Sequence, residues 1–356
     1  MRTDKKKFST RLMTALMAGT LAVGMLGTTA FAEGTNQTGT TPVVSKVTLT
    51  KKITKRADVY SPAATFTFTI TPGTAVAATA NTDEIKAGPA GGVTFEGNAT
   101  STTIASTPVL EKDGNTEVIT VGSKNLQVNE ASFKYTNGKW KPGIYRYNIA
   151  ESVGNYEGIT YDATTRYFDV YVTTSGIVSK SFVNVNNTKV KDDGIITNDY
   201  DKDHNNKIND LTIEKELAGD MADDSDEFEF TVTINGADNE KYNVIYSDGR
   251  TAGTITSKTP ATIKLKGGQS ARITGLSHND SYTVEEADYT SKGYTVSYDD
   301  NKSGKISVDT TTTVTNTKNA VSPTGIVLNY GPYILMIALA GSMAVFFLRK
   351  KNRKEA

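Results

Sequence analysis

The segment 47–53 reads VTLTKKI, and the segment 211–217 reads LTIEKEL. Side chains alternate between the two faces of a strand, so each segment predicts a strand with one apolar face. That face carries a lysine among its apolar residues, Lys51 in the first segment and Lys215 in the second. Lysine is almost never fully buried without a partner. One such lysine fits a strand end with its ammonium at the rim. Two in the same position of two repeats indicate an interior that uses an amine.

An acid and an amide follow each lysine at matching places. GIYRYNIAES predicts a strand on which Glu151 shares a face with a tyrosine and an isoleucine, and SYTVEEAD places Glu286 in the same way. Two short β-branched runs then end in Asn198 and Asn316. The order Lys, Glu, Asn therefore occurs twice, on the first strand, a late strand and the last strand of each repeat.

These three residue types have a joint chemistry. Burial lowers the pKa of a lysine and raises the pKa of a glutamic acid. The neutral amine of Lys51 can then attack the side-chain carbonyl of Asn198, while Glu151 polarises that carbonyl and shuttles protons. Ammonia leaves and an amide joins the two strands. The second set predicts the same reaction. The alternative is a buried ion pair with a nearby asparagine; the duplication favours the amide.

These features resemble the backbone (major) pilins of Gram-positive bacteria, of the streptococcal isopeptide-linkage type. The resemblance is carried by the two Lys, Glu, Asn sets, by Tyr147 and Tyr282, and by the segments ATFTFTI and EFEFTVTI. It covers nearly all of the chain between two targeting segments. It implies an all-β fold of two tandem Ig-like (Cna B-type) β-sandwich domains.

The chain begins with a secretory signal peptide over residues 1–32. Lysines and an arginine precede a short apolar run, and Ala30-Phe31-Ala32 has the small-x-small cleavage pattern. An N-terminal membrane anchor is the alternative, but the apolar run is short for a membrane span. Residues 33–45 are rich in Thr, Gly and Asn and predict a flexible segment.

The C-terminus resembles a cell-wall sorting signal. Ser322, Pro323, Thr324 and Gly325 precede an apolar segment, 326–348, and a basic tail. The segment is long enough to span a bilayer, and the basic tail would stay cytoplasmic. Sortases that read such signals cleave between Thr and Gly. Ser322 stands where an aliphatic residue is common. A plain tail anchor is the alternative.

The residues between these segments predict two domains. Short strand patterns separated by turn residues are typical of β-sandwiches. We expect the first sandwich at 46–199, a linker at 200–210, the second sandwich at 211–319 and the sorting signal at 320–356. The region 72–108 is rich in Gly, Ala and Thr and predicts long loops or a lateral insertion.

Composition narrows the function. The chain has no cysteine, so amides rather than disulfides would supply its cross-links. The net charge of zero indicates no nucleic-acid partner.

Asp201, Asp203 and Asn205 are spaced like calcium ligands. However, Asn206 stands where the turn glycine would be, and Thr212 stands where the bidentate glutamate would be, which favours a solvated linker. No motif for a cofactor, a metal or an enzyme active site is present, apart from the single-turnover amide reaction.

The resemblance implies the shaft subunit of a covalent pilus, with a monomeric wall-anchored adhesin or stalk as the alternative. A wall-anchored enzyme has no supporting site. A shaft subunit needs an exposed lysine that receives Thr324 of the next subunit. We expect Lys191, with Lys189 and Lys180 as alternates. The implied partners are identical subunits, pilus and housekeeping sortases, peptidoglycan, and minor or tip pilins. Sec export, brief membrane retention and covalent attachment to the wall would place the protein at the cell surface.

Overall fold

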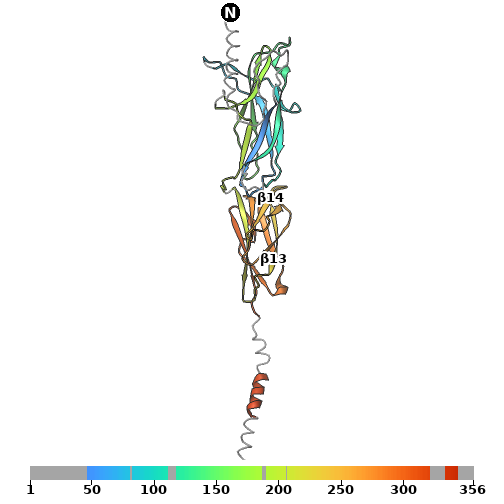
Figure 1. Ribbon diagram of the computed structural model, residues 1–356, viewed down its shortest axis with the longest axis vertical. Coiled ribbons are helices and arrows are strands. Elements are labelled where there is room, and N and C mark those ends of the chain that lie inside the picture. The colour runs from blue at the N-terminus through green and yellow to red at the C-terminus, as the bar shows by residue number, and fades with distance from the viewer. Residues whose placement is uncertain are drawn as a thin grey trace, which may run out of the picture.

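The computed structural model describes residues 46–80, 82–110, 118–186, 190–205, 207–320 and 333–343. The predicted signal peptide, the segment 33–45, the Ser322–Gly325 motif and Lys189 lie outside these residues. Figure 1 shows two β-rich bodies stacked end to end along the long axis of the molecule. The prediction of an all-β chain with two tandem sandwiches is confirmed.

The first domain packs two sheets face to face. The five-stranded sheet has the order β4-β6-β1-β11-β8, and the six-stranded sheet has the order β10-β9-β7-β2-β5 with β3 paired to β7. A short 3-10 helix, η1, covers Glu130–Phe133. The bounds are β1 Val47–Lys55, β2 Thr65–Pro72, β3 Ile85–Ala87, β4 Val93–Phe95, β5 Ser101–Ala105, β6 Val118–Val128, β7 Gly143–Glu151, β8 Ile159–Thr160, β9 Arg166–Thr173, β10 Gly176–Val183 and β11 Ile195–Tyr200.

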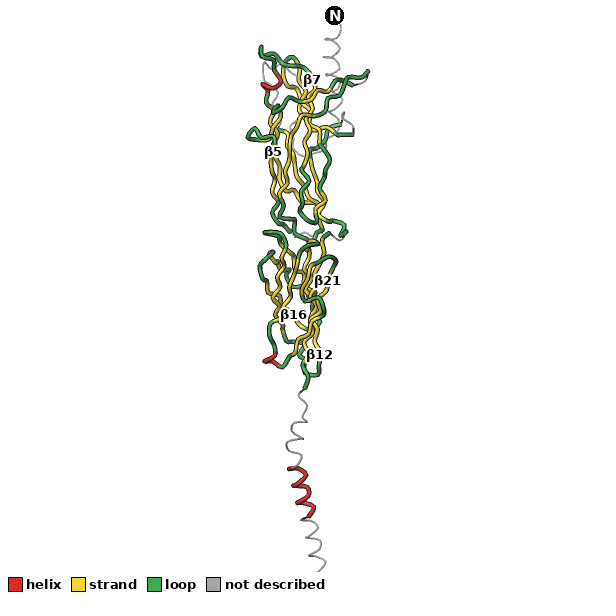
Figure 2. Tube along the Cα trace, turned by 180° about the vertical axis from the view of Figure 1, so that it is seen from behind, coloured by secondary structure: helices red, strands yellow, loops and turns green. Residues whose placement is uncertain are grey.

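The second domain, the lower body in Figure 2, repeats this plan with fewer strands. Its sheets have the orders β15-β14-β17-β12-β21-β19 and β16-β13-β18-β20, and η2 covers Thr290–Lys292. The strand bounds are β12 Ile208–Ala218, β13 Glu227–Asn235, β14 Lys241–Tyr246, β15 Gly253–Thr256, β16 Ala261–Lys266, β17 Ser270–Ser277, β18 Ser281–Glu286, β19 Thr295–Tyr298, β20 Ser303–Lys305 and β21 Thr310–Thr317.

Alternating apolar residues build a separate core in each domain. Along β1, Leu49, Lys51, Ile53 and Lys55 are buried and the residues between them are not, as the period of two predicts. The opposing sheet contributes aromatic side chains such as Phe68 on β2. The second core is built in the same way around β12 and β13. Each core therefore encloses one of the two repeated lysines.

The first and last strands of each domain pair in parallel. Lys51 lies opposite Ile196 in the β1–β11 ladder, and Lys215 lies opposite Val314 in the β12–β21 ladder. The asparagine is two residues further along in both cases, so it shares the inward face with the lysine. The acid comes from the facing sheet, where Glu151 is paired with Phe68. The fold thus delivers three chain-distant side chains to one point.

The region 72–108 contains three short strands, β3, β4 and β5, in addition to loops. Neighbouring strands supply their pairing partners, which local composition does not reveal. The glycines of this region permit close packing on Tyr147. A Cβ at Gly88 would lie 2.3 Å from the tyrosine ring, and the Tyr147 hydroxyl donates to the carbonyl of Pro89 at 2.9 Å.

A charged cluster joins the two domains on one side of their junction. Arg56, just after β1, donates to the Asp210 carboxylate of β12 at 2.9 Å. In the opposite direction, Arg272 of β17 donates to the Asp58 carboxylate at 2.9 Å. Arg272 also donates to Asp210 at 2.6 Å, so the four side chains form one network.

A tyrosine–carboxyl cluster forms a second contact between the domains. Tyr156 of the first domain donates to Glu240 Oε1 of the second domain at 2.8 Å. The Tyr242 hydroxyl lies 2.8 Å from Glu240 Oε2 and 2.9 Å from Asp280 Oδ2. Glu240 and Asp280 are both buried. A hydroxyl has one proton, so it can donate to only one of the two carboxyl groups.

A helix at 333–343 lies within the predicted membrane segment 326–348, whose other residues are outside the described ranges. Among the residues that the structure describes, no helix combines the length and the apolar character needed to cross a membrane.

Candidate functional site

The first predicted set meets in the core of domain one. Lys51 Nζ donates to Glu151 Oε2 at 2.8 Å, and Asn198 Nδ2 donates to Glu151 Oε1 at 2.7 Å. The side chains of Lys51 and Glu151 are fully buried, as is Asn198. The amine also lies 4.7 Å from the centre of the Phe66 ring. One carboxyl group thus bridges the amine and the amide.

Burial lowers the pKa of Lys51 to about 8, because the apolar surroundings disfavour the ammonium more than Glu151 stabilises it. The ordinary pKa of a lysine side chain is 10.5. A neutral amine is therefore far more populated at this site near neutral pH than on an exposed lysine. Only the neutral amine is a nucleophile.

The Asn198 carbonyl has a partner that the sequence did not indicate. Its Oδ1 accepts from the main-chain N–H of Asp162 at 2.9 Å. A main-chain N–H only donates, so this contact fixes which end of the amide is the oxygen. Glu151 consequently contacts the amide nitrogen, not the carbonyl oxygen that the sequence pattern had led us to expect. No pattern of side chains could have revealed Asp162, because it acts here through its backbone.

The second set converges with looser contacts. Lys215 Nζ lies 3.7 Å from Glu286 Oε1 and donates to the carbonyls of Glu216 at 2.9 Å and Val314 at 3.0 Å. Its position over the Phe228 ring, 4.5 Å from the centre, matches that of Lys51 over Phe66. The two lysines therefore occupy equivalent places in the two domains.

Burial shifts both ionisable groups of the second set toward their neutral forms. It lowers the pKa of Lys215 to about 8 and raises the pKa of Glu286, which the nearby Lys215 offsets only in part. The amide atoms of Asn316 and both carboxyl oxygens of Glu286 are buried without a hydrogen-bond partner among the described residues. Unpaired polar groups in a core are costly. The second set thus holds its reactants near one another but not in a connected hydrogen-bond network.

Two of the three candidate acceptor lysines lie in the described residues. Lys191 is exposed and forms an isolated β-bridge with Val183, at the end of β10. Lys180 is half-buried in the middle of β10, and burial lowers its pKa. It lines an open cleft together with Lys46. Lys191 is the more accessible of the two for an enzyme that delivers an acyl group.

The linker residues that have the calcium-like spacing form a loop that is closed by hydrogen bonds to Asp201. Asp201 is buried, and its carboxylate accepts from the main-chain N–H groups of Asn205, Lys207 and Ile208 at 2.8–3.2 Å. Asp201, the first of the three residues with this spacing, therefore accepts hydrogen bonds from the main chain of its own loop.

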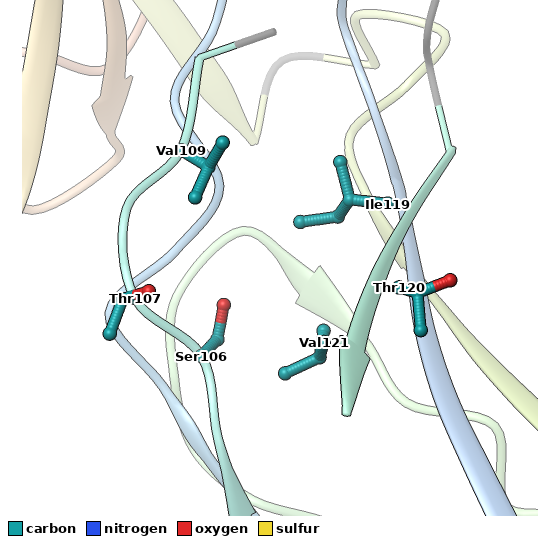
Figure 3. Close-up of a pocket in the computed structure, with 6 residues that line it drawn as sticks. All are labelled: Ser106, Thr107, Val109, Ile119, Thr120 and Val121. Carbon is teal, nitrogen blue, oxygen red and sulfur yellow. The ribbon is translucent and has the colours of Figure 1, made fainter. Parts of the chain in front are cut away.

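Figure 3 shows a small cavity between the segment after β5 and strand β6. Its volume is about 80 Å³, and it is lined by Ser106, Thr107, Val109, Ile119, Thr120 and Val121. Ligand pockets usually enclose several hundred Å³. None of the predicted site residues that the structure describes lines this cavity.

Comparisons with known proteins match the two domains separately. Residues 47–201 match the family described as Spy0128-like isopeptide containing domain, and residues 209–318 match a domain of unknown function, DUF7601. A curated protein named pilin, from Streptococcus pyogenes serotype M1, is 27% identical over 351 residues, which cover 91% of this chain and 96% of the relative.

A solved structure supports the same fold. The crystal structure of the major pilin from Streptococcus pyogenes matches with a TM-score of 0.50 and 22% identity, over 78% of this chain and 99% of that chain. The first domain is therefore similar to the Spy0128-like isopeptide containing domain, and the resemblance of the whole chain to the Gram-positive backbone pilins is confirmed.

Proposed function

We propose that this chain is the structural shaft subunit of a covalently polymerised surface pilus, stabilised by self-formed Lys–Asn amides. The observation that carries the proposal is the buried contact of Lys51 and Asn198 with one carboxyl group, at 2.8 and 2.7 Å. The equivalent placement of Lys215 supports it. So does the similarity to a pilin along 91% of the chain.

The amide reaction uses only groups of this chain. The neutral Lys51 amine attacks Cγ of Asn198, and a C–N bond forms as the carbonyl electrons move onto Oδ1. Glu151 accepts a proton from the attacking nitrogen and gives one to Nδ2, which leaves as ammonia. One amine and one amide thus become a substituted amide and ammonia. The packed core supplies the effective concentration of the two reactants.

Assembly would use the N-terminal export signal, the C-terminal sorting signal and an acceptor lysine of the first domain. After Sec export, a pilus sortase would cleave between Thr324 and Gly325 and transfer the Thr324 carboxyl to Lys191 of a neighbouring subunit. Such a contact is head-to-tail and does not close, so it generates a filament. Minor or tip pilins would join by the same chemistry. A housekeeping sortase would finally attach the filament to peptidoglycan at the cell surface.

The test is a blot of wall extracts from cells that express the wild type or Lys191→Ala. We expect a high-mass ladder in the wild type and its loss in the variant, with the folded monomer still attached to the wall. Lys264→Ala, at an exposed lysine of the second domain, is the matched control and should keep the ladder. A ladder that persists in Lys191→Ala shows that another lysine, such as Lys189 or Lys180, is the acceptor. A single band in the wild type would favour the monomeric adhesin.

A further inference from the structure

The two sets of reactive residues differ in how the asparagine carbonyl is held. In the first domain, Asn198 Oδ1 accepts from the main-chain N–H of Asp162 at 2.9 Å. In the second domain, Asn316 Oδ1 is buried and has no hydrogen-bond donor in the part of the chain that the structure describes. The carbonyl oxygen becomes negatively charged when an amine adds to an amide. A donor already aimed at it stabilises this charge without rearrangement.

The donor sits on a loop that is tied to the strand carrying the reactive amide. The loop connects β8 with β9, and Thr160 of β8 is paired with Asp199 of β11, next to Asn198. The Asp162 carboxylate accepts from the Thr164 N–H at 2.9 Å and from Arg166 Nη2 at 2.7 Å. These contacts fix the direction of the Asp162 N–H.

Arg166 extends this support to the strand itself. Its Nη2 and Nε donate to the carbonyl of Ile195 at 3.2 and 3.4 Å, and Ile195 is the first residue of β11. The Arg166 guanidinium therefore ties the loop that contains Asp162 to the start of β11. Asn198 lies three residues further along the same strand.

We propose that the Asp162 main-chain N–H is an oxyanion donor for amide formation in the first domain, that Arg166 positions it, and that the first amide consequently forms faster than the second. The proposal rests on the amide chemistry proposed above. The negative charge on Oδ1 in the tetrahedral intermediate is stabilised by Asp162 while Glu151 transfers the proton from the Lys51 nitrogen to Nδ2. When the C–Nδ2 bond breaks, the electrons return from Oδ1 and ammonia departs.

The second set begins from a different arrangement. The Lys215 amine is hydrogen-bonded to two main-chain carbonyls, and the carboxyl of Glu286 is 3.7 Å away. The Asn316 side chain is near enough to Glu286 to lower the pKa of that carboxyl group, but neither of its polar atoms makes a hydrogen bond of normal length to a described residue. The Lys215 amine must give up its hydrogen bonds to the two main-chain carbonyls, and Glu286 must move closer to it, before the amine can add to the Asn316 carbonyl. This requirement adds to the barrier and slows the second reaction.

The experiment follows both amides in one molecule. The full chain is synthesised in a cell-free system, samples are quenched in acid at intervals, and linked and unlinked peptides are quantified by mass spectrometry. In the wild type we expect the Lys51–Asn198 amide to form at least tenfold faster than the Lys215–Asn316 amide. Equal rates, or a faster second amide, would overturn the proposal.

Two substitutions of one residue separate the backbone donor from the side chain. Asp162→Pro removes the N–H, and we expect the first amide to form roughly 100- to 1,000-fold more slowly, the usual effect of losing an oxyanion donor. Asp162→Asn keeps the N–H and should stay within about tenfold of the wild type, since one neutral hydrogen bond then replaces a charged one. The rate at which the second amide forms is the internal reference and should not change. An unchanged first amide in Asp162→Pro refutes the donor role.

Arg166 tests the positioning role and covers the case in which proline disrupts the domain. Folding is compared by near-ultraviolet circular dichroism in a Glu151→Ala background, where no first amide can form. We expect Arg166→Ala to slow the first amide at least tenfold and Arg166→Lys to recover part of the rate. If Arg166→Ala folds and reacts at the wild-type rate, the positioning role is wrong. If the wild type releases no ammonia from either domain, the proposed function itself fails, whatever these variants do.

Discussion

Replacing Glu151 by Gln tests the link between the buried carboxyl group and the stability of the first domain. Glutamine keeps the size of the side chain but cannot shuttle a proton between Lys51 and Asn198. We expect the intact mass of the wild-type protein to be two ammonias below the sequence mass and that of the variant to be one ammonia below. Only the Lys215–Asn316 amide should remain.

The size of the stability loss follows from the loop that the amide closes. Lys51 and Asn198 are separated by roughly 150 residues, and a cross-link around a loop of that size stabilises the folded state by about 5 kcal/mol. In the variant, Lys51 also remains an unreacted amine, buried in the core without a carboxyl group beside it, so the total loss exceeds this figure. For a domain of this size, a loss of about 5 kcal/mol lowers Tm by roughly 10–20 °C.

Calorimetry combined with intact-mass measurement is the assay. We expect Glu151→Gln to lower the melting transition of the first domain and Glu286→Gln to lower that of the second. Glu285→Gln is the matched control, because Glu285 is exposed on the opposite face of the same strand, and it should change neither mass nor Tm. The reasoning is refuted if Glu151→Gln still releases both ammonias, or if it retains one ammonia and melts like the wild type.

Further outcomes concern pH and force. Because burial lowers the pKa of Lys51 and Lys215 to about 8, the rate of ammonia release should rise with pH up to about 8 and then level off; a rate independent of pH would contradict this. Burial, followed by the neighbouring Glu240, raises the pKa of Asp280 from 3.8 to about 6. The stability that this group contributes is therefore fully present below its unfolded pKa and is lost as pH rises through about 6. Protection factors of amides at the domain junction, which are exchange rates corrected for the intrinsic pH dependence of exchange, should accordingly be higher at pH ~5 than at pH ~7.5, and Asp280→Asn should remove most of that difference. In single-molecule stretching, the wild type should extend little, while Glu151→Gln should add one long unfolding step from the first domain. Long steps from both domains of the wild type would exclude amides that carry force.

The sequence predicted the reactive side chains because strand alternation is a local property. A lysine flanked by apolar residues at spacing two must face the core, and the same holds for Glu151 and Glu286. The prediction that Lys51 and Asn198 lie on the first and last strands of one domain followed from the repeated order of residues and from the resemblance, whereas the parallel pairing of β1 with β11 is seen only in the structure. The assignment of these residues to amide bonds stays a prediction until the mass is measured.

Other features depend on contacts that no local pattern encodes. The Asp162 N–H acts through the backbone, so its residue type carries no signal. The contact between Tyr156 and Glu240 forms only when the two domains are stacked. The strands within 72–108 were missed because their pairing comes from β2, β6 and β7, and because the Gly- and Thr-rich composition resembles a loop.

The domain junction has a consequence for where a filament of such subunits bends. Only a short connection separates Tyr200 of β11 from Ile208 of β12, and it is flanked by the charged cluster around Asp210 and by the tyrosine–carboxyl cluster around Glu240. Bending at this point would separate buried, hydrogen-bonded partners on at least one side. The two domains should therefore tilt as a single stiff rod. Curvature of the fibre would then concentrate at the joints between successive subunits, with a spacing of two domain lengths rather than one.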